Sequence, residues 1–363
     1  MVKLYKELSS CRPSVTSDAY ILNILPLFNE TLAVLSSADE ILVVNARTLD
    51  STQVSRIAES GKGLTCTAVD EATRLIFSGG TDNLVSVFDI RSGHRAATLP
   101  IGKSVTALAC RGNDVAVGTE LNQYQADLAI WDVRQQRIRW QNNENNDDIT
   151  DLGFHPSKPH ILLSGGDDGL VSLFDTTVQE EDDSLVQAFN HGPIHKAGFV
   201  DQSAVYALSS DQNLAIHPIF EHQRETEPCP VLLGDMRRLV SCEYVIDLLH
   251  AGDEFIVATG SHSKSQVDLI NMKGGIEPDL QNKTVLQNAH GDEIVRTIFI
   301  DTANSYIVFT GAEDGYVKAW HPADVPPHQD LGGVQTSIDK KSKPAKHSRP
   351  RKRSSVDARY KPY

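Results

Sequence analysis

The sequence predicts an all-β protein in which seven similar units close into a ring, the architecture called a β-propeller. Three observations support this fold. Two segments, Ser78–Asp89 and Ser164–Asp175, share a short strand, a tight Asp-containing turn and a second strand that ends in Phe-Asp. Marker residues recur at a step of 43 positions, and two further units follow with insertions. A period of about 40–45 residues with four short strands per unit is typical of propeller blades.

The 43-residue step is visible in two columns of the repeat. The first column marks the end of one strand in each of five consecutive units, at Asn45, Phe88, Trp131, Phe174 and His217. The second column lies six residues earlier and holds the turn aspartates Asp39, Asp82, Asp168 and Asp211. Five markers in one register are not a chance arrangement, so the first five units follow directly from the spacing.

The last two units are displaced by insertions. The sixth runs through Phe255–Gly260 and Val267–Asn271, and the seventh through Tyr306–Gly311 and Tyr316–Trp320. The seventh has no fourth strand, because the chain after Trp320 is interrupted by prolines. The alternating segment Val2–Leu8 precedes the first unit, and we predict that it supplies the missing strand, which closes the ring and leaves no long unpaired edge.

The charge is divided unequally along the chain, which predicts a propeller over residues 1–323 and a tail over residues 324–363. Residues 340–363 contain ten Lys or Arg and one Asp and carry a net charge of +9. Because the whole chain carries −14, residues 1–339 carry −23. The tail lacks apolar periodicity and is expected to be disordered. An acidic body repels nucleic acid and favours basic proteins. The alternative is that the acidity only keeps a large domain in solution.

Composition and motifs argue against several other classes. No stretch reaches the ~18 apolar residues of a membrane span, and the N-terminus lacks the apolar core of a secretory signal. The five cysteines include no CxxC pair, so neither a zinc site nor a disulfide framework is indicated. Dinucleotide-binding, P-loop, serine-hydrolase and zinc-protease motifs are absent from the sequence. We therefore expect a protein that is not an enzyme and that has no cofactor, metal or membrane partner.

The repeat resembles the WD-repeat superfamily. The last unit contains His290 followed by Gly291, and then Thr310, Asp314 and Trp320. In that family these His, Thr, Asp and Trp side chains hydrogen-bond to one another inside a blade, so the resemblance implies a structural tetrad rather than a catalytic set. The other units are less complete, because Phe or His replaces the Trp in several of them.

A narrower resemblance spans most of the propeller and rests on segments distributed along it: Gly118–Glu120, Asp127–Arg134, Asp148–Thr150, Phe154–Pro156, Ser164–Asp175, Glu180–Asp183, Asp235–Arg237 and Gly311–Trp320. In these segments the chain resembles the family of WD-repeat-containing protein 89. Several of these are general WD-repeat features, whereas Thr119-Glu120 and Asp235–Arg237 are less general. The resemblance implies the architecture far more clearly than it implies a biochemical role.

Trp131-Asp132-Val133-Arg134 suggests one docking site. It resembles the Trp-Asp-x-Arg box by which WD-repeat propellers dock to the adaptor of a cullin–RING ubiquitin ligase. In that resemblance Asp132 and Arg134 make polar contacts at one face of the propeller. The alternative is that Asp and Arg commonly follow this strand, as they do in Phe88–Arg91.

The tail suggests a second functional segment. Its basic residues are clustered and include a compact Pro-Arg-Lys-Arg run; they are Lys340, Lys341, Lys343, Lys346, Arg349, Arg351, Lys352 and Arg353. Such a run is typical of a nuclear import signal or of a phosphate-binding arm. The alternative is a solvated tail without a receptor.

Together these features predict a non-catalytic protein-interaction scaffold in the nucleus, with the cytoplasm as a further compartment. The propeller would be monomeric within a complex and would bind a basic client, such as a ribosomal protein or a histone. Ribosome assembly fits slightly better, because rRNA could make a weak contact with the tail while the acidic body holds a ribosomal protein. The alternative function is a substrate receptor that docks to the adaptor of a cullin–RING ubiquitin ligase.

Overall fold

The computed structural model describes residues 2–57, 62–219, 229–304 and 306–324. The chain divides into two units, Met1–Pro327 and His328–Tyr363, and all the described residues belong to the first. The sequence placed this boundary between residues 323 and 324. The predicted disordered tail lies outside the described residues, apart from Asp324.

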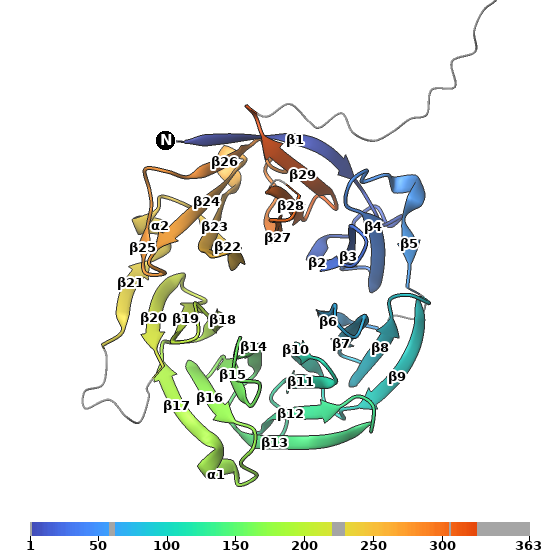
Figure 1. Cartoon of the computed structure of the whole chain (residues 1–363), viewed down its shortest axis with the longest axis vertical. Helices are drawn as coiled ribbons and strands as arrows, with labels where there is room; N and C mark the ends of the chain where they lie inside the picture. Colours follow the sequence, from blue (N-terminus) through green and yellow to red (C-terminus); the bar gives the residue numbers. More distant parts are fainter. Residues whose placement is uncertain (1, 58–61, 220–228, 305, 325–363) are drawn as a thin grey trace, which may run out of the picture. The chain divides into compact units, whose positions relative to one another are not determined.

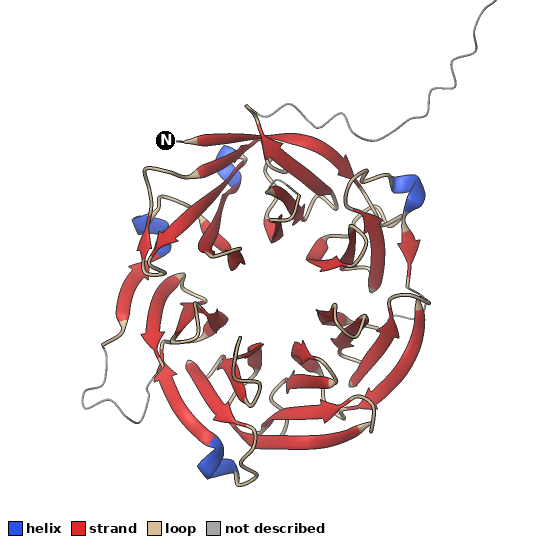
Figure 2. Cartoon of the chain, viewed as in Figure 1, coloured by secondary structure: helices blue, strands red, loops and turns tan. Residues whose placement is uncertain are grey.

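The first unit is an all-β ring of seven blades, which confirms the predicted fold (Figures 1 and 2). The chain runs once around the ring, and each blade is a meander of four antiparallel strands with its first strand at the centre. Blades one to three are β2 (Ile21–Leu27), β3 (Thr31–Ser36), β4 (Glu40–Asn45), β5 (Ser55–Arg56); β6 (Leu64–Asp70), β7 (Leu75–Gly80), β8 (Leu84–Asp89), β9 (His94–Pro100); and β10 (Val105–Arg111), β11 (Asp114–Thr119), β12 (Ala126–Asp132), β13 (Arg137–Asn145).

Blades four to seven continue this order around the ring. They are β14 (Ile149–Phe154), β15 (Ile161–Gly166), β16 (Leu170–Asp175), β17 (Leu185–Asn190); β18 (Ile194–Phe199), β19 (Ala204–Ser209), β20 (Asn213–Pro218), β21 (Val231–Asp235); β22 (Tyr244–Ala251), β23 (Glu254–Ser261), β24 (Gln266–Lys273), β26 (Thr284–Gln287); and β27 (Val295–Asp301), β28 (Ile307–Ala312), β29 (Val317–Pro322), β1 (Lys3–Cys11). The short β25 (Glu277–Pro278) pairs with β24.

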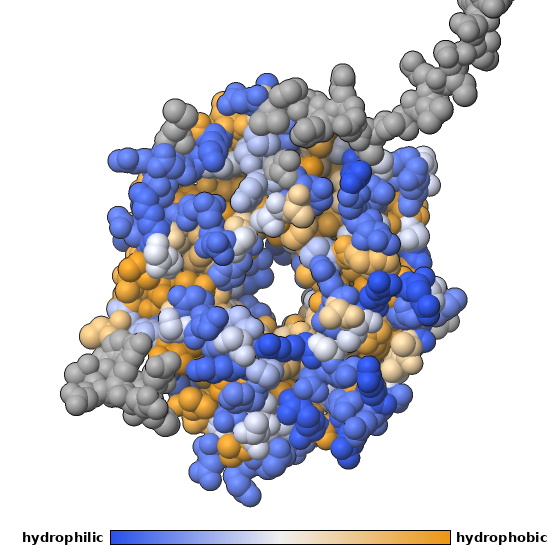
Figure 3. Space-filling model, in the orientation of Figure 1, coloured by the Kyte–Doolittle hydropathy of each residue, from blue (hydrophilic) through white to orange (hydrophobic). Residues whose placement is uncertain are grey.

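Helical structure in the described residues is limited to single turns in the connections: η1 (Ser51–Gln53), α1 (Glu181–Ser184), α2 (Met236–Leu239) and η2 (His262–Lys264). Among the same residues, none of these helices has the length and apolar character needed to cross a membrane. The space-filling view shows that an opening remains at the centre of the ring (Figure 3).

Glycine in the second strands explains how neighbouring blades come close together. A Cβ atom on Gly79 would lie 2.5 Å from Val105 Cγ1, and one on Gly165 would lie 2.7 Å from Ile194 Cγ2. Val105 and Ile194 each begin the first strand of the next blade. The Ser-Gly-Gly run that reveals the repeat in the sequence is therefore required by packing, because any larger residue would push the next blade away.

Hydrogen bonds between neighbouring first strands add to this packing. The Thr65 hydroxyl donates to the Val105 carbonyl at 2.5 Å, and the Thr106 hydroxyl donates to the Ile149 carbonyl at 2.6 Å. Thr150 repeats the contact with the Ile194 carbonyl at 2.8 Å. Three consecutive blade junctions are thus held by the same side chain at the same position.

The aromatic marker column also acts between blades. Phe88, Trp131, Phe174 and Trp320 are buried, and each packs into a cluster that contains residues of the preceding blade. His217 occupies this position in blade five, where its ring lies 4.5 Å from that of Phe189 in blade four. In these five blades the marker position therefore holds a large side chain that packs against the preceding blade, whereas blade one has Asn45 there.

The N-terminal segment closes the ring as the sequence predicts. β1 pairs antiparallel with β29, with Glu7 opposite Trp320 and Cys11 opposite Val317, so the strand extends beyond the predicted Val2–Leu8. β1 also pairs in parallel with β26 of blade six, where Leu4 lies opposite Val285. This second pairing was not predicted, and it joins blades six and seven into one sheet.

Candidate functional site

The meander gives the ring two different faces. The first strand of a blade starts, and the fourth ends, on the same face, so the connections between blades gather there together with the turns between second and third strands. We call this the connection face. The remaining turns, including the one between β12 and β13, lie on the opposite face.

Seven carboxylates gather where blade three meets blade four, and we call them the acidic site. They come from four segments that the fold brings together: the end of β13, the connection to β14, the turn between β15 and β16, and helix α1. A cavity of 140 Å³ at this junction is lined by residues from all four segments. Glu144, Asp147, Asp168, Glu181 and Asp182 line the cavity, and Asp148 and Asp167 adjoin them along the chain.

The carboxylates perturb one another in two groups, Glu144 with Glu181 and Asp182, and Asp167 with Asp147, Asp148 and Asp168. The pKa of Glu144 is raised, first by the negative charge of Asp182 and then by burial, with a further contribution from Glu181. The pKa of Asp167 is raised first by burial and then by Asp147 and its neighbours. For Glu144 the first cause is the charge of Asp182, so the two ionised carboxylates repel each other at neutral pH and a cation bound beside them would be stabilised.

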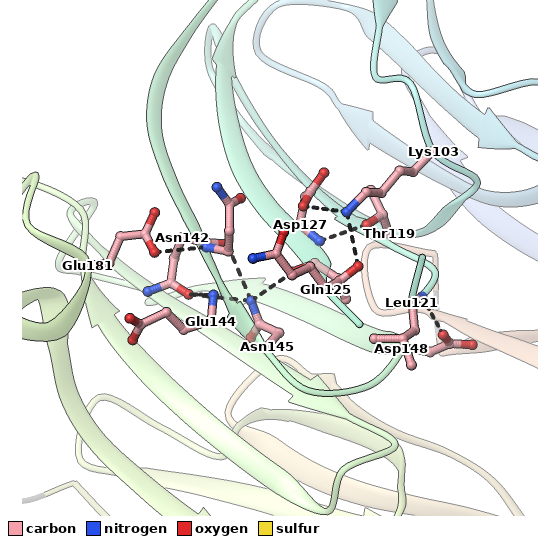
Figure 4. A network of polar contacts seen from close by, with 12 residues as sticks. Lys103, Thr119, Leu121, Gln125, Asp127, Asn142, Glu144, Asn145, Asp148 and Glu181 are labelled. Atoms are coloured by element: carbon pink, nitrogen blue, oxygen red, sulfur yellow. Dashed lines mark hydrogen bonds and ion pairs between the residues drawn. The ribbon is translucent and has the colours of Figure 1, made fainter. Parts of the chain in front are cut away.

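Within the described part of the chain, none of these seven carboxylates forms an ion pair with Lys, Arg or His. Nearby acids differ in this respect. Lys103 Nζ lies 2.7 Å from Asp127 Oδ1 and also donates to the Gln125 carbonyl at 3.0 Å (Figure 4). Lys103 is therefore paired with Asp127 and neutralises none of the seven carboxylates of the acidic site.

Main-chain hydrogen bonds hold the acidic site in place (Figure 4). The Leu121 amide donates to Asp148 Oδ1 at 2.6 Å, and the Asn143 amide donates to Glu181 Oε2 at 3.4 Å. Asn142, which is buried, accepts from the Glu144 amide at 3.1 Å through Oδ1. Asp148 thus has a structural role as well, whereas Glu144 and Asp182 are exposed at the surface.

The sequence marked Asp168 as a turn residue and placed Asp148 and Glu180–Asp183 in segments of the family resemblance, but it did not show that these acids lie together. The fold joins them because the end of blade three, the second-to-third turn of blade four and its third-to-fourth connection meet at one junction. The acidic run Glu180–Asp183, which overlaps α1, is the sequence signal for this site. Placing the last residues of each unit beside the Asp-containing turn of the following unit would have predicted that these acids are neighbours.

The structure brings the four predicted tetrad residues together inside blade seven. His290 Nδ1 lies 2.8 Å from Asp314 Oδ2, and His290 Nε2 lies 2.7 Å from Thr310 Oγ1. Trp320 Nε1 donates to the same Thr310 hydroxyl at 2.8 Å. His290, Thr310 and Trp320 are buried, so the arrangement is closed to substrate and fixes the turn and the indole.

The predicted docking residues lie at the end of β12 and in the turn that follows. Trp131 is buried against blade two, and Asp132 Oδ1 accepts from the Gln135 amide at 3.0 Å. Arg134 is exposed on the opposite face and has no ion pair with any described residue. Only Arg134 and part of Asp132 are therefore open to a partner.

The basic residues predicted to carry nuclear import or phosphate contact, Lys340 to Arg353, lie outside the described residues. Metal binding was not predicted, and within the described ranges the structure contains no group of three or more His, Cys, Asp or Glu that could hold a metal ion.

Comparisons with known proteins agree with the fold. Residues 137–175 match the WD40 family, described as WD domain, G-beta repeat. A WD repeat-containing protein of Saccharomyces cerevisiae, YNL035C, is 32% identical over 324 residues, which cover 86% of this chain and 82% of that protein. A WD repeat-containing protein of Schizosaccharomyces pombe, C63.06, is 33% identical over 68% of this chain and 78% of that protein.

Two more distant similarities extend this picture. The WD repeat-containing protein 89 homolog of Dictyostelium discoideum is 23% identical over 69% of each chain, in line with the narrower resemblance seen in the sequence. The crystal structure of the WD40 beta propeller domain of Doa1 is 13% identical, with a TM-score of 0.62, and covers 87% of this chain and 96% of that one. The blades, the closure and these relatives together show that the chain belongs to the WD-repeat family of β-propeller proteins.

Proposed function

We propose that this chain is a non-catalytic scaffold whose acidic site, at the junction of blades three and four, binds a Lys- and Arg-rich segment of a protein client. A WD-repeat propeller is a platform for protein–protein interaction, and the proposal adds the surface and the chemistry of the partner. The observation that carries it is the gathering of seven carboxylates without a single cationic partner among the described residues.

The electrostatics of the whole chain support this choice of partner. Residues 1–339 carry −23, so a basic protein is drawn toward the propeller from a distance, within the ~8 Å screening length of physiological salt. At the acidic site, the charge of Asp182 is the first cause of the raised pKa of Glu144, and this repulsion would be relieved by a Lys or Arg side chain. The raised pKa of Asp167 comes first from burial and then from the neighbouring acids. The binding should therefore weaken steeply as salt concentration rises.

The compartment and the process belong to the same proposal. The basic tail, with Arg351, Lys352 and Arg353 at its centre, directs the protein to the nucleus and makes a weak contact with RNA. Basic clients in the nucleus are chiefly ribosomal proteins and histones, and ribosome assembly unites a ribosomal protein on the propeller with rRNA on the tail. The propeller acts there as a monomer within a larger complex.

A second function is supported by Arg134. In blade two, the corresponding Arg91 forms an ion pair with Asp89, with its Nη2 3.8 Å from Asp89 Oδ2. Arg134 has no such partner among the described residues and is exposed. A free Arg beside Asp132 is the arrangement that docking to the adaptor of a cullin–RING ubiquitin ligase would use, and this is the alternative function.

Charge neutralisation at the acidic site tests the main proposal. The variant Glu144→Gln, Glu181→Gln, Asp182→Asn should bind a fluorescent oligolysine peptide about tenfold more weakly than the wild type, because each exposed pair contributes roughly 0.2–1 kcal/mol. The binding is measured by fluorescence anisotropy at low and at high salt. The variant should also show a smaller loss of affinity as salt is added.

The matched control removes the same charge from another blade. Asp253→Asn, Glu254→Gln, Glu277→Gln changes three exposed acids of blade six that form no ion pair within the described ranges. It should bind the peptide nearly as well as the wild type. Equal losses in both variants would show that only the net charge matters, and the acidic site would then have no special role.

A further inference from the structure

Four exposed apolar side chains lie on the connection face where blade seven meets blade one, and we call them the blade-seven patch. Their exposed fractions are 95% for Val15, 40% for Tyr20, 40% for Ile294 and 38% for Tyr316. Single exposed apolar residues are ordinary on a protein surface, whereas several from adjoining segments mark a site of interaction.

Contacts between the segments show that the patch is one surface. The carbonyl of Ala19 lies 2.6 Å from the position of a Cβ on Gly315, the residue before Tyr316. The Arg12 guanidinium lies over the Tyr316 ring, 5.8 Å from its centroid. The amide of Glu313 donates to the Ile294 carbonyl at 3.0 Å. The connection from β1 to β2, the start of β27 and the turn before β29 therefore meet.

The connection that carries Val15 is tied down on both sides of that residue. Ser14 is buried, and its hydroxyl donates to the carboxylate of buried Glu40 at 2.5 Å. Tyr20 exchanges two hydrogen bonds with Ser37, at 2.9 Å and 3.0 Å. The connection holds Val15 out into solvent in a fixed position, which lowers the entropy lost when a partner covers it.

The margin of the patch is acidic. Asp18, Asp292 and Glu293 are exposed, and none of them forms an ion pair with a described residue. The nearby cation Arg296 is paired with Glu313, with its Nη2 2.5 Å from Oε1. Arg12, over the Tyr316 ring, is a second cation and donates to the Ser17 carbonyl, so the three acids outnumber the one cation that has no carboxylate partner among the described residues. Apolar side chains inside a margin of net negative charge are complementary to apolar side chains flanked by Lys or Arg.

We propose that the blade-seven patch is a second docking surface for the basic client, and that it takes a segment in which aliphatic or aromatic side chains lie next to Lys or Arg. This inference rests on the proposed function, which supplies the client, and it adds what the acidic site lacks. Exposed ion pairs give little affinity by themselves, whereas covering Val15 and the two tyrosines excludes water from a rigid apolar surface.

The test uses the full chain and three short fluorescent peptides. The first is lysine-rich and contains two leucines, the second has serines in place of the leucines, and the third has glutamates in place of the lysines. The wild type should bind the leucine–lysine peptide most tightly, the serine–lysine peptide more weakly, and the glutamate peptide least. Anisotropy titrations give the affinities.

The variant Val15→Ser removes an apolar side chain without changing the charge. It should bind the leucine–lysine peptide about tenfold more weakly than the wild type, and the serine–lysine peptide equally well. Tyr124→Ser is the matched control, because Tyr124 is 93% exposed on the same face in the turn between β11 and β12. Both side chains lie in solvent, so neither change should alter folding.

The two proposals fail in different ways. If Val15→Ser binds the leucine–lysine peptide as the wild type does, or no more weakly than Tyr124→Ser, the patch is not a docking surface. If neutralising Glu144, Glu181 and Asp182 leaves the serine–lysine peptide bound as before, the acidic site fails instead.

Two further results would assign the patch to another occupant and overturn the inference. Self-association of the wild type that Val15→Ser abolishes, seen by light scattering, would show that a second copy of the chain covers it. Binding of the leucine–lysine peptide only after Arg351, Lys352 and Arg353 are changed to alanine would show that the chain's own tail does so.

Discussion

Tyr5 of β1 lies opposite Leu286 of β26, in a parallel pairing that ties the first residues of the chain to blade six. On its other edge the same residue lies opposite Pro322 of blade seven. The Tyr5 side chain is buried in a cluster that contains Leu286 and Trp320. The closure of the ring is therefore a joint between three segments and not a simple fourth strand.

Removal of the closing strand should open the ring. Deletion of residues 1–9 exposes the edges of β29 and β26, so the protein should aggregate and lose its cooperative thermal transition. Tyr5→Ala should lower the free energy of unfolding by about 3–5 kcal/mol, as for other large buried side chains, whereas Leu8→Ser, at an exposed position, should change it little. Chemical denaturation measures both. A deletion variant as soluble and stable as the wild type would contradict the closure.

The blade-seven tetrad should contribute stability and not binding. His290→Ala leaves Thr310 and Asp314 without their partner, and the loss should be about 1–3 kcal/mol. The oligolysine affinity should stay unchanged, since His290 is buried away from the acidic site. His94→Ala, at an exposed position in β9, is the control and should melt like the wild type. Unchanged stability with lost binding would mean that a binding residue had been taken for a structural one.

The ligase function makes its own prediction at the turn after β12. Because Arg134 is exposed and forms no ion pair with described residues, Arg134→Ala should abolish co-purification of the cullin–RING adaptor without changing the melting temperature. Arg91→Ala in blade two is the matched control and should leave co-purification intact. Adaptor binding that survives Arg134→Ala, or that is missing in the wild type, removes the basis of this function.

The acidic site should lower stability at neutral pH. Its residues Glu144 and Asp167 have raised pKa values in the folded state, so the folded protein holds these protons more tightly than the unfolded chain. The destabilisation is full above the raised values and disappears as the pH falls below the ordinary values of 4.5 and 3.8. Glu144→Gln with Asp167→Asn should therefore raise the melting temperature at pH 7 but not at about pH 3.5. An advantage that persists in acid would argue against charge repulsion.

The basic tail can be tested independently of the propeller. Changing Arg351, Lys352 and Arg353 to alanine should move a fluorescent fusion from the nucleus to the cytoplasm and flatten the salt dependence of RNA binding. The melting temperature should not change, because the tail is expected to contribute no core. A variant that stays nuclear, with the same salt slope, would leave the tail as a solubilising appendage.

The period in the sequence predicted most of the fold because each blade makes the same contacts with the next. Gly79 and Gly165 must be small where the following blade approaches, and Trp131 and Phe174 must be large where they pack on the preceding one. These local requirements repeat at a fixed step, so they are visible in the sequence alone. The parallel pairing of Tyr5 with Leu286 has no such repeat, and it occurs only where the ring closes.

The sequence by itself determined the seven blades, the closing strand, and the division between an acidic body and a basic tail. Only the tertiary structure decided which surface residues act together. Glu144 and Asp182 are 38 positions apart and become neighbours because a blade junction joins them. The connection that carries Val15 meets the turn that carries Tyr316 only through the closure. Repeated packing leaves a mark on the sequence because it constrains every unit alike. A surface assembled once, from turns of different blades, is constrained by no such period.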